Sequence, residues 1–202
     1  MSLKATVGAG LMCVGLVLVI AGARGMAEDA KAAAKELNVG DPAPEFTIKD
    51  DTGKDWKSGD HFGKKLVVVY FYPADMTGGC TKQACGFRDD FEKLKEAGVE
   101  VVGVSGDTVR NHQLFKQEKS LTFTLLADEK GEVASKFGVP FTKETKVVNT
   151  TIAGKPEALT REITTKRWTF LVDQDMKIAY KNSQVDAAKD SQAILEVVSK
   201  LK

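Results

Sequence analysis

The sequence predicts an α/β fold in which helices cover both faces of a central mixed sheet. Two largely apolar runs, residues 66–71 (LVVVYF) and 99–104 (VEVVGV), fit strands that are buried on both faces. A segment with helical spacing of its apolar residues follows each run. Strands that alternate with helices in this way are typical of a sheet that carries helices on both faces.

The domain is expected to begin near Gly40, because Pro42 and Pro44 suit an extended entry into the first strand. The predicted strands lie at residues 46–48, 66–71, 99–104 and 123–126. The predicted helices lie at residues 80–97, 109–118 and 132–137. The first of these helices is expected to stop at Gly98.

The C-terminal part breaks this alternation. Residues 141–166 are polar and include Gly154 and Pro156, so we interpret them as a surface insertion in the domain of residues 40–202. Residues 168–172 and 177–181 flank a turn and predict a hairpin. An amphipathic helix is expected at residues 186–201.

The N-terminal residues 1–27 have the pattern of a secretory signal. Lys4 precedes an uncharged apolar stretch, and small residues follow it. Retention of this segment as a membrane anchor is the alternative, since its length approaches the roughly 20 residues that span a bilayer. Residues 28–39 are interpreted as a linker. The sequence therefore predicts an exported protein, periplasmic or otherwise extracytoplasmic, that meets a membrane only if residues 1–27 are retained.

The overall charge gives no sign of a polyanionic partner. The formal net charge is +1, and it becomes −1 without residues 1–27, which hold Lys4 and Arg24 but no acidic residue. Nucleic acid is therefore not expected as a partner.

Two cysteines, Cys80 and Cys85, remain after the N-terminal segment, and Cys80 falls at the start of a predicted helix. The unpaired N–H groups and the positive dipole end at that position favour an anion, here a nucleophilic thiolate. Gly78 and Gly79 leave these N–H groups uncovered, and Thr77 offers a hydroxyl three residues before Cys80.

The spacing of the two cysteines argues against a permanent disulfide. In an intact helix the Cα atoms of residues five apart lie roughly 8 to 9 Å from each other, beyond what a disulfide bridges without backbone movement. A transient bond that unwinds the first turns of the helix fits the pattern better. A metal site is disfavoured, because His61 and His112 have no ligand spacing. A thioredoxin-type pair would normally have two residues between the cysteines, not four.

The segment from Pro73 to Cys80 (PADMTGGC) resembles the active-site pattern of the peroxiredoxins. Cys80 to Asp89 (CTKQACGFRD) is similar to the peroxiredoxin Q subgroup, also called bacterioferritin comigratory protein, of the AhpC/TSA-like peroxiredoxins. The resemblance runs from about Val39 to the C-terminus without residues 141–166, and it includes the segment 167–173. Gly78 departs from the pattern of this subgroup, because many of its members have proline at that position.

The resemblance implies a thioredoxin-like fold and a thiol-dependent peroxidase without a cofactor. Cys80 would attack hydrogen peroxide or an organic hydroperoxide, and Cys85 would resolve the sulfenic acid as an intramolecular disulfide. A thioredoxin-like dithiol would reduce that disulfide. Arg167 would stabilise the thiolate and orient the peroxide, with Arg88 and Arg110 as competing candidates. Thr77 would form a hydrogen bond at the site and Pro73 would shield it from water; members of the subgroup are often monomers.

Two other functions are kept as alternatives. One is a thioredoxin-like disulfide oxidoreductase that acts on proteins, and the other is a membrane-anchored redox sensor read by a partner.

Overall fold

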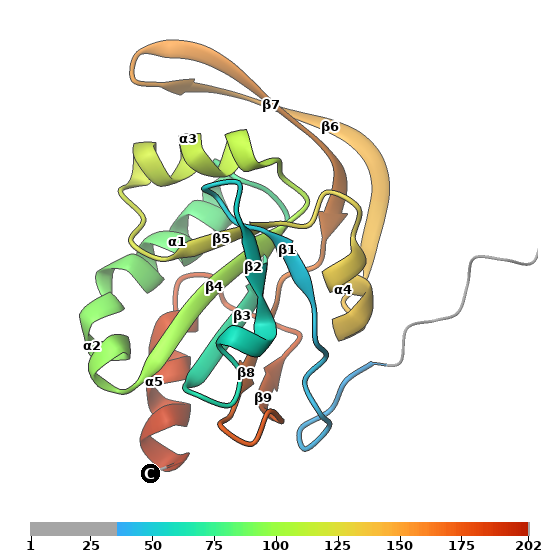
Figure 1. The fold of residues 1–202 in the computed structure, drawn as a ribbon. Helices are drawn as coiled ribbons and strands as arrows, with labels where there is room; N and C mark the ends of the chain where they lie inside the picture. Colours follow the sequence, from blue (N-terminus) through green and yellow to red (C-terminus); the bar gives the residue numbers. More distant parts are fainter. Residues whose placement is uncertain (1–35, 202) are drawn as a thin grey trace, which may run out of the picture. The chain divides into compact units, whose positions relative to one another are not determined.

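A five-stranded mixed sheet forms the centre of the computed structural model, which describes residues 36–201 (Figure 1). The strands lie in the order β5 (Thr124–Ala127), β4 (Val99–Ser105), β3 (Leu66–Phe71), β8 (Trp168–Val172) and β9 (Ile178–Asn182). β3, β4 and β5 are parallel, and β8 is antiparallel to β3 and β9. The predicted mixed sheet is confirmed.

The side chains of β3 alternate between two separate cores. Val67, Val69 and Phe71 pack on one face, and Val68 and Tyr70 pack on the other. Because successive residues of a strand point to opposite faces, an apolar run with no polar interruption requires both faces to be covered. That requirement is the physical reason why the run of residues 66–71 identified a central strand.

Helices cover the face that carries Tyr70. α1 (Gly78–Asp89), α2 (Phe91–Glu96), α3 (Val109–Lys119) and α5 (Asp190–Leu201) all contribute residues to this core. The other face is covered by α4 (Glu132–Phe137) and by the small sheet of β1 (Thr47–Lys49) and β2 (Asp55–Lys57), which precedes the short helix η1 (Ser58–Asp60).

Two predicted helices have different bounds in the structure. The helix expected at 80–97 starts earlier, at Gly78, and is interrupted at Asp90. The Asp90 carboxylate accepts hydrogen bonds from Ser191 and Gln192 at the start of α5, which holds the chain at the break between α1 and α2. The final helix begins at Asp190 rather than at 186, because Asp186 caps a separate turn before it.

Residues 141–166, predicted to be a surface insertion, contain a long hairpin of β6 (Phe141–Ile152) and β7 (Lys155–Thr165). Its two-residue turn has positive φ at Ala153 and Gly154, the combination that matches the twist of a hairpin. The hairpin runs over α3 (Figure 1), where the amide of Asn111 donates to the Thr160 carbonyl at 3.1 Å.

Within residues 36–201, no helix is both long enough and apolar enough to span a membrane. The predicted signal or anchor at residues 1–27 and most of the predicted linker at 28–39 lie outside the described residues.

Candidate active site

Cys80 is the third residue of α1, directly after the loop that leaves the carboxyl end of β3. Thr77 is the N-cap in an extended conformation, and its carbonyl accepts the first helical hydrogen bond, from Thr81 N at 2.8 Å. Cys80 is only 1% exposed and packs in the core that contains Tyr70. The thiol therefore lies in an apolar environment at the positive end of a twelve-residue helix.

Arg167 is the cation at this thiol. Its Nη2 donates to Cys80 Sγ at 3.2 Å, and its Nη1 donates to Gln83 Oε1. The sheet explains how residues so far apart in sequence meet: Trp168 of β8 pairs with Phe71 of β3, so the residue before β8 lies beside the loop after β3. Hydrogen bonds with an ionised donor such as a guanidinium are stronger than those between neutral groups.

The competing arginines have other partners. Arg88 donates to the Asp89 carboxylate and to the Lys119 carbonyl. The hydrogen bond with Asp89 raises the pKa of Arg88. Arg110 donates to Glu157 of the hairpin at 3.0 Å.

Gly79 provides the space that Arg167 occupies. A Cβ atom at this position would lie 3.3 Å from Arg167 Nη2, closer than an ordinary van der Waals contact. At Gly78, by contrast, nothing lies within 4 Å of such an atom. The two glycines thus differ: only Gly79 leaves room for the guanidinium.

Thr77 and Pro73 lie in the loop between β3 and α1, both half-buried. The Thr77 hydroxyl donates to the Ala74 carbonyl at 3.0 Å, so its oxygen keeps lone pairs that can accept a hydrogen bond. Met76 has φ of 60°, a left-handed conformation that is uncommon for a residue with a side chain. Such conformations persist where the surrounding structure fixes them, often at functional sites.

Cys85 is half-buried and lies on α1 with Cys80, and both thiols are free. The helix between them is continuous from Gly78 to Asp89. Of the five residues predicted from the sequence, the structure brings Arg167 to Cys80 and places Thr77 and Pro73 in the preceding loop. It separates Cys85 from Cys80 by more than one helical turn.

A buried polar chain behind Arg167 was not predicted from the sequence. Gln83 of α1 and Asp190 of α5 are 1% and 2% exposed, and Gln83 Nε2 donates to Asp190 Oδ2 at 2.7 Å. Thr169 Oγ1 donates to the same oxygen at 2.7 Å. Burial raises the pKa of Asp190, although the hydrogen bonds from Thr169 and Gln83 and the charge of Arg167 oppose that effect. Gln83 lies one helical turn after Cys80. Asp190 lies 107 positions after Gln83. No sequence pattern near Cys80 indicates that Asp190 belongs to the site.

A second buried network, also missed, holds the loop from behind. Asp75 in the loop accepts from the Tyr72 hydroxyl at 2.8 Å and lies 2.8 Å from His112 Nδ1. The backbone N–H of Asp75 donates to Asp107 Oδ2 at 2.9 Å, and the side-chain amide of Asn111 donates to Asp107 Oδ1 at 3.1 Å. His112, which was not expected to bind a metal, is fully buried.

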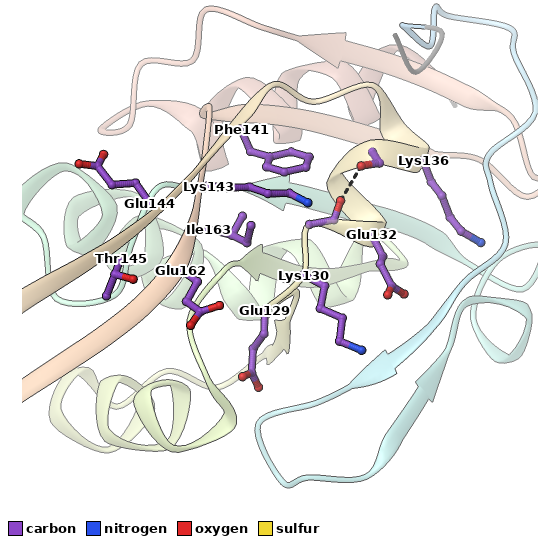
Figure 2. A pocket seen from close by; sticks show the side chains of 12 residues that line it. Glu129, Lys130, Glu132, Lys136, Phe141, Lys143, Glu144, Thr145, Glu162 and Ile163 are labelled. Carbon is purple, nitrogen blue, oxygen red and sulfur yellow. Dashed lines mark hydrogen bonds between the residues drawn. The ribbon is translucent and has the colours of Figure 1, made fainter. Parts of the chain in front are cut away.

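A pocket of about 950 Å³ lies elsewhere, between α4 and the start of β6 (Figure 2). Figure 2 shows Phe141 and Lys143 of β6 beside Glu132 at the start of α4 and beside Glu129 and Lys130 in the loop before that helix. None of the five residues predicted from the sequence lines this pocket.

The fold and the site define a thioredoxin-like protein with a buried thiol that a guanidinium contacts at a helix N-terminus. The chain belongs to the AhpC/TSA family, whose model matches residues 39–181. This match confirms the resemblance to the peroxiredoxins that the motif indicated.

Among curated proteins, the chain is similar to the chloroplastic peroxiredoxin Q of Suaeda salsa. The two are 53% identical over 105 residues, which cover 52% of this chain and 49% of the relative. The chloroplastic peroxiredoxin Q of Arabidopsis thaliana is 51% identical over 105 residues, which cover 52% of this chain and 48% of the relative. The chain thus spans about half the length of the curated relatives it matches.

Solved structures show the same fold. Peroxidoxin BcpB from Mycobacterium tuberculosis is 30% identical with a TM-score of 0.69, and the match covers 83% of this chain and 99% of that one. The bacterioferritin comigratory protein of Xanthomonas campestris is 24% identical with a TM-score of 0.63, over 77% of this chain and 91% of that one. The predicted thioredoxin-like fold is confirmed.

The prediction of an exported, periplasmic or extracytoplasmic protein is wrong. The curated relatives at this level of identity are chloroplastic proteins, so they reside inside a cell. The prediction rested on Lys4, on the uncharged apolar stretch after it and on the small residues that follow, in a segment without acidic residues. Organelle transit peptides are also poor in acidic residues, so this composition does not separate export from import into an organelle.

Proposed function

We propose that the protein is a thiol-dependent peroxidase that reduces hydrogen peroxide or organic hydroperoxides. The observation that carries the proposal is the 3.2 Å contact between Arg167 Nη2 and Cys80 Sγ at the start of α1. A helix N-terminus and a guanidinium together favour a thiolate, the form of cysteine that acts as a nucleophile. The name peroxiredoxin Q of the curated relatives agrees with this chemistry.

In the first step, the Cys80 thiolate attacks one peroxide oxygen. The S–O bond forms as the O–O bond breaks, which leaves a sulfenic acid on Cys80 and releases water or an alcohol once the leaving oxygen takes up a proton. Arg167 stabilises the thiolate and the negative charge that develops on the oxygens. The Thr77 hydroxyl accepts a hydrogen bond from the peroxide, and Pro73 limits the access of water.

In the second step, the Cys85 sulfur displaces the hydroxyl of the sulfenic acid, which forms the Cys80–Cys85 disulfide and releases water. Because α1 is continuous between the two residues, its first turns must unwind for the sulfurs to meet. A thioredoxin-like dithiol then exchanges with the disulfide, is itself oxidised and restores both thiols. Both cysteines belong to one chain, so we propose that a monomer completes the cycle.

The test is dithiol-dependent consumption of hydrogen peroxide and of an alkyl hydroperoxide, in the presence of a thioredoxin system. We expect turnover in the wild type and none in Cys80→Ser. In Cys85→Ser we expect a single round of peroxide reduction and a sulfenate on Cys80 that dimedone traps. Exchange with protein thiols without peroxide consumption would contradict the proposal and favour a disulfide oxidoreductase.

A further inference from the structure

The side chain of Gln83 lies between two groups of opposite kind. On one side the Asp190 carboxylate, which accepts hydrogen bonds, contacts Gln83 Nε2 at 2.7 Å. On the other side Arg167, which only donates, contacts Gln83 Oε1. The Gln83 amide thus connects the start of α5 to the guanidinium that contacts Cys80.

The chemistry of these partners determines which way the amide faces. An ionised carboxylate has no hydrogen to donate, so it selects the NH₂ end of Gln83. The carbonyl end must then face Arg167 and accept from it. With the amide reversed, its NH₂ group would face the donors of Arg167 and displace the guanidinium. Asp190 therefore excludes the orientation that would repel Arg167.

The surroundings of Asp190 make this carboxylate unusual for a purely structural residue. It is 2% exposed, and its Oδ1 is buried without a hydrogen-bond partner among the described residues. A buried carboxylate with one oxygen left without a hydrogen bond destabilises a fold. Its other oxygen nevertheless accepts two hydrogen bonds of 2.7 Å, from Gln83 and Thr169. The better satisfied oxygen is the one that faces the site.

We propose that Asp190 is a positioning residue of the thiol site: it orients the Gln83 amide, and this amide holds Arg167 with its second nitrogen on Cys80. The effect of Asp190 on peroxide turnover rests on the proposed peroxidase function. Its effect on the reactivity of the Cys80 thiol does not, so that effect is testable without peroxide.

The first test measures the rate at which iodoacetamide alkylates Cys80, as a function of pH, in a Cys85→Ser background. With Asp190→Ala we expect alkylation at neutral pH to slow by roughly three- to tenfold, as for the loss of one hydrogen bond, and the profile to move to higher pH. Removal of a negative charge near the thiol would, by electrostatics alone, move the profile to lower pH. The direction of the shift therefore separates positioning from a simple charge effect.

Ser191→Ala is the matched control. Ser191 also lies at the start of α5 and contacts the other end of α1, through Asp90 at 2.8 Å, without touching Gln83. We expect this variant to leave the alkylation profile in place. An unchanged profile in Asp190→Ala, or an equal shift in both variants, would overturn the proposal.

The second test exchanges the amide and the carboxylate between positions 83 and 190. It also serves if Asp190→Ala does not fold. Gln83→Glu alone places two carboxylates in contact and should slow alkylation. With Asp190→Asn added, the asparagine NH₂ can donate to the introduced carboxylate, which still accepts from Arg167, so alkylation should recover. Failure of the double variant to exceed Gln83→Glu would contradict the proposal. Recovery of alkylation without any peroxide turnover in the wild type would support the positioning role and refute the peroxidase.

Discussion

At the scale of residues, the reactivity of Cys80 is determined by what surrounds its sulfur. The residue is almost fully buried, a position in which a lone thiolate would be costly. The Arg167 guanidinium compensates for this cost with a hydrogen bond to the sulfur, and α1 adds the positive end of its dipole. In the proposed mechanism, charge rather than exposure therefore makes this cysteine a nucleophile.

Arg167→Lys tests the importance of the guanidinium geometry. A lysine keeps the positive charge but cannot contact Cys80 and Gln83 through two nitrogens at once. We expect the rate of sulfenic acid formation to fall about 10- to 100-fold, the value of one hydrogen bond to a charged group. Stopped-flow kinetics of the first step measures it, with Arg110→Lys as the control. Equal rates in Arg167→Lys and wild type would refute the assigned role.

Gly79→Ala should separate stability from activity. Alanine favours a helix over glycine by up to about 1 kcal/mol, but its Cβ would lie 3.3 Å from Arg167 Nη2 and displace it. We expect a similar or higher free energy of unfolding, measured by urea denaturation, together with a several-fold slower first step. Gly78→Ala, where nothing lies within 4 Å, gives the same gain in helix propensity without the displacement. Equally fast reaction of both variants with peroxide would show that Gly79 does not make room for Arg167.

At the scale of elements, α5 holds both ends of α1. Asp190 contacts Gln83 near the start of α1, and Ser191 and Gln192 contact Asp90 just after its end. In the proposed mechanism, formation of the disulfide between Cys80 and Cys85 has to release the contact between Asp190 and Gln83, because Gln83 lies between the two cysteines. The stability of the first turns of α1 should therefore limit how fast the disulfide forms.

Gly78→Pro tests this dependence. Gly78 is the first residue of α1, where proline is favoured, and Thr77 before it has the extended conformation that proline requires. We expect the free energy of unfolding to rise by about 0.4–1 kcal/mol and disulfide formation after peroxide addition to slow. Quenched-flow mass spectrometry follows the conversion of sulfenate to disulfide. Faster disulfide formation would show that unwinding of this turn is not limiting.

Elements with a local pattern could be predicted from the sequence, whereas those that depend on distant partners could not. The strand at residues 66–71 was predicted with the bounds it has, because a continuous apolar run requires two covered faces. The hairpin of β6 and β7 was missed, since its strands are polar on one side and its turn, Ala153–Gly154, is not a common hairpin pair. The cysteines, Thr77 and Pro73 belong to one sequence motif and could be predicted together. Asp190 could not be predicted, because its contact with Gln83 depends on the packing of α5 against α1.

At the scale of the whole molecule, the buried Asp75–His112 pair links stability to pH. Burial alone would lower the pKa of His112, but the charge and hydrogen bond of Asp75, with a contribution from Asp107, raise that pKa above its ordinary value. A histidine whose pKa is higher in the folded than in the unfolded state stabilises the fold while it is protonated. That stabilisation is complete below the unfolded pKa and is lost as pH rises through the folded pKa.

We therefore expect the contribution of His112 to the free energy of unfolding to decrease as pH rises from slightly acidic to alkaline values. Urea denaturation at a series of pH values measures it, and the comparison with His112→Gln isolates the histidine. The variant should be less stable at slightly acidic pH, where His112 is protonated, and its stability should change less with pH over the same window. Identical slopes in the two proteins would contradict the assignment.

Amide hydrogen exchange of residues 81–86 tests most directly whether disulfide formation requires α1 to unwind. The comparison is between the reduced protein and the confirmed Cys80–Cys85 disulfide form. Exchange reports local opening of a helix residue by residue. We expect strong protection of these amides in the reduced form, where α1 is continuous, and a marked loss of protection in the disulfide form. Unchanged protection in the disulfide form would contradict the requirement that α1 unwinds.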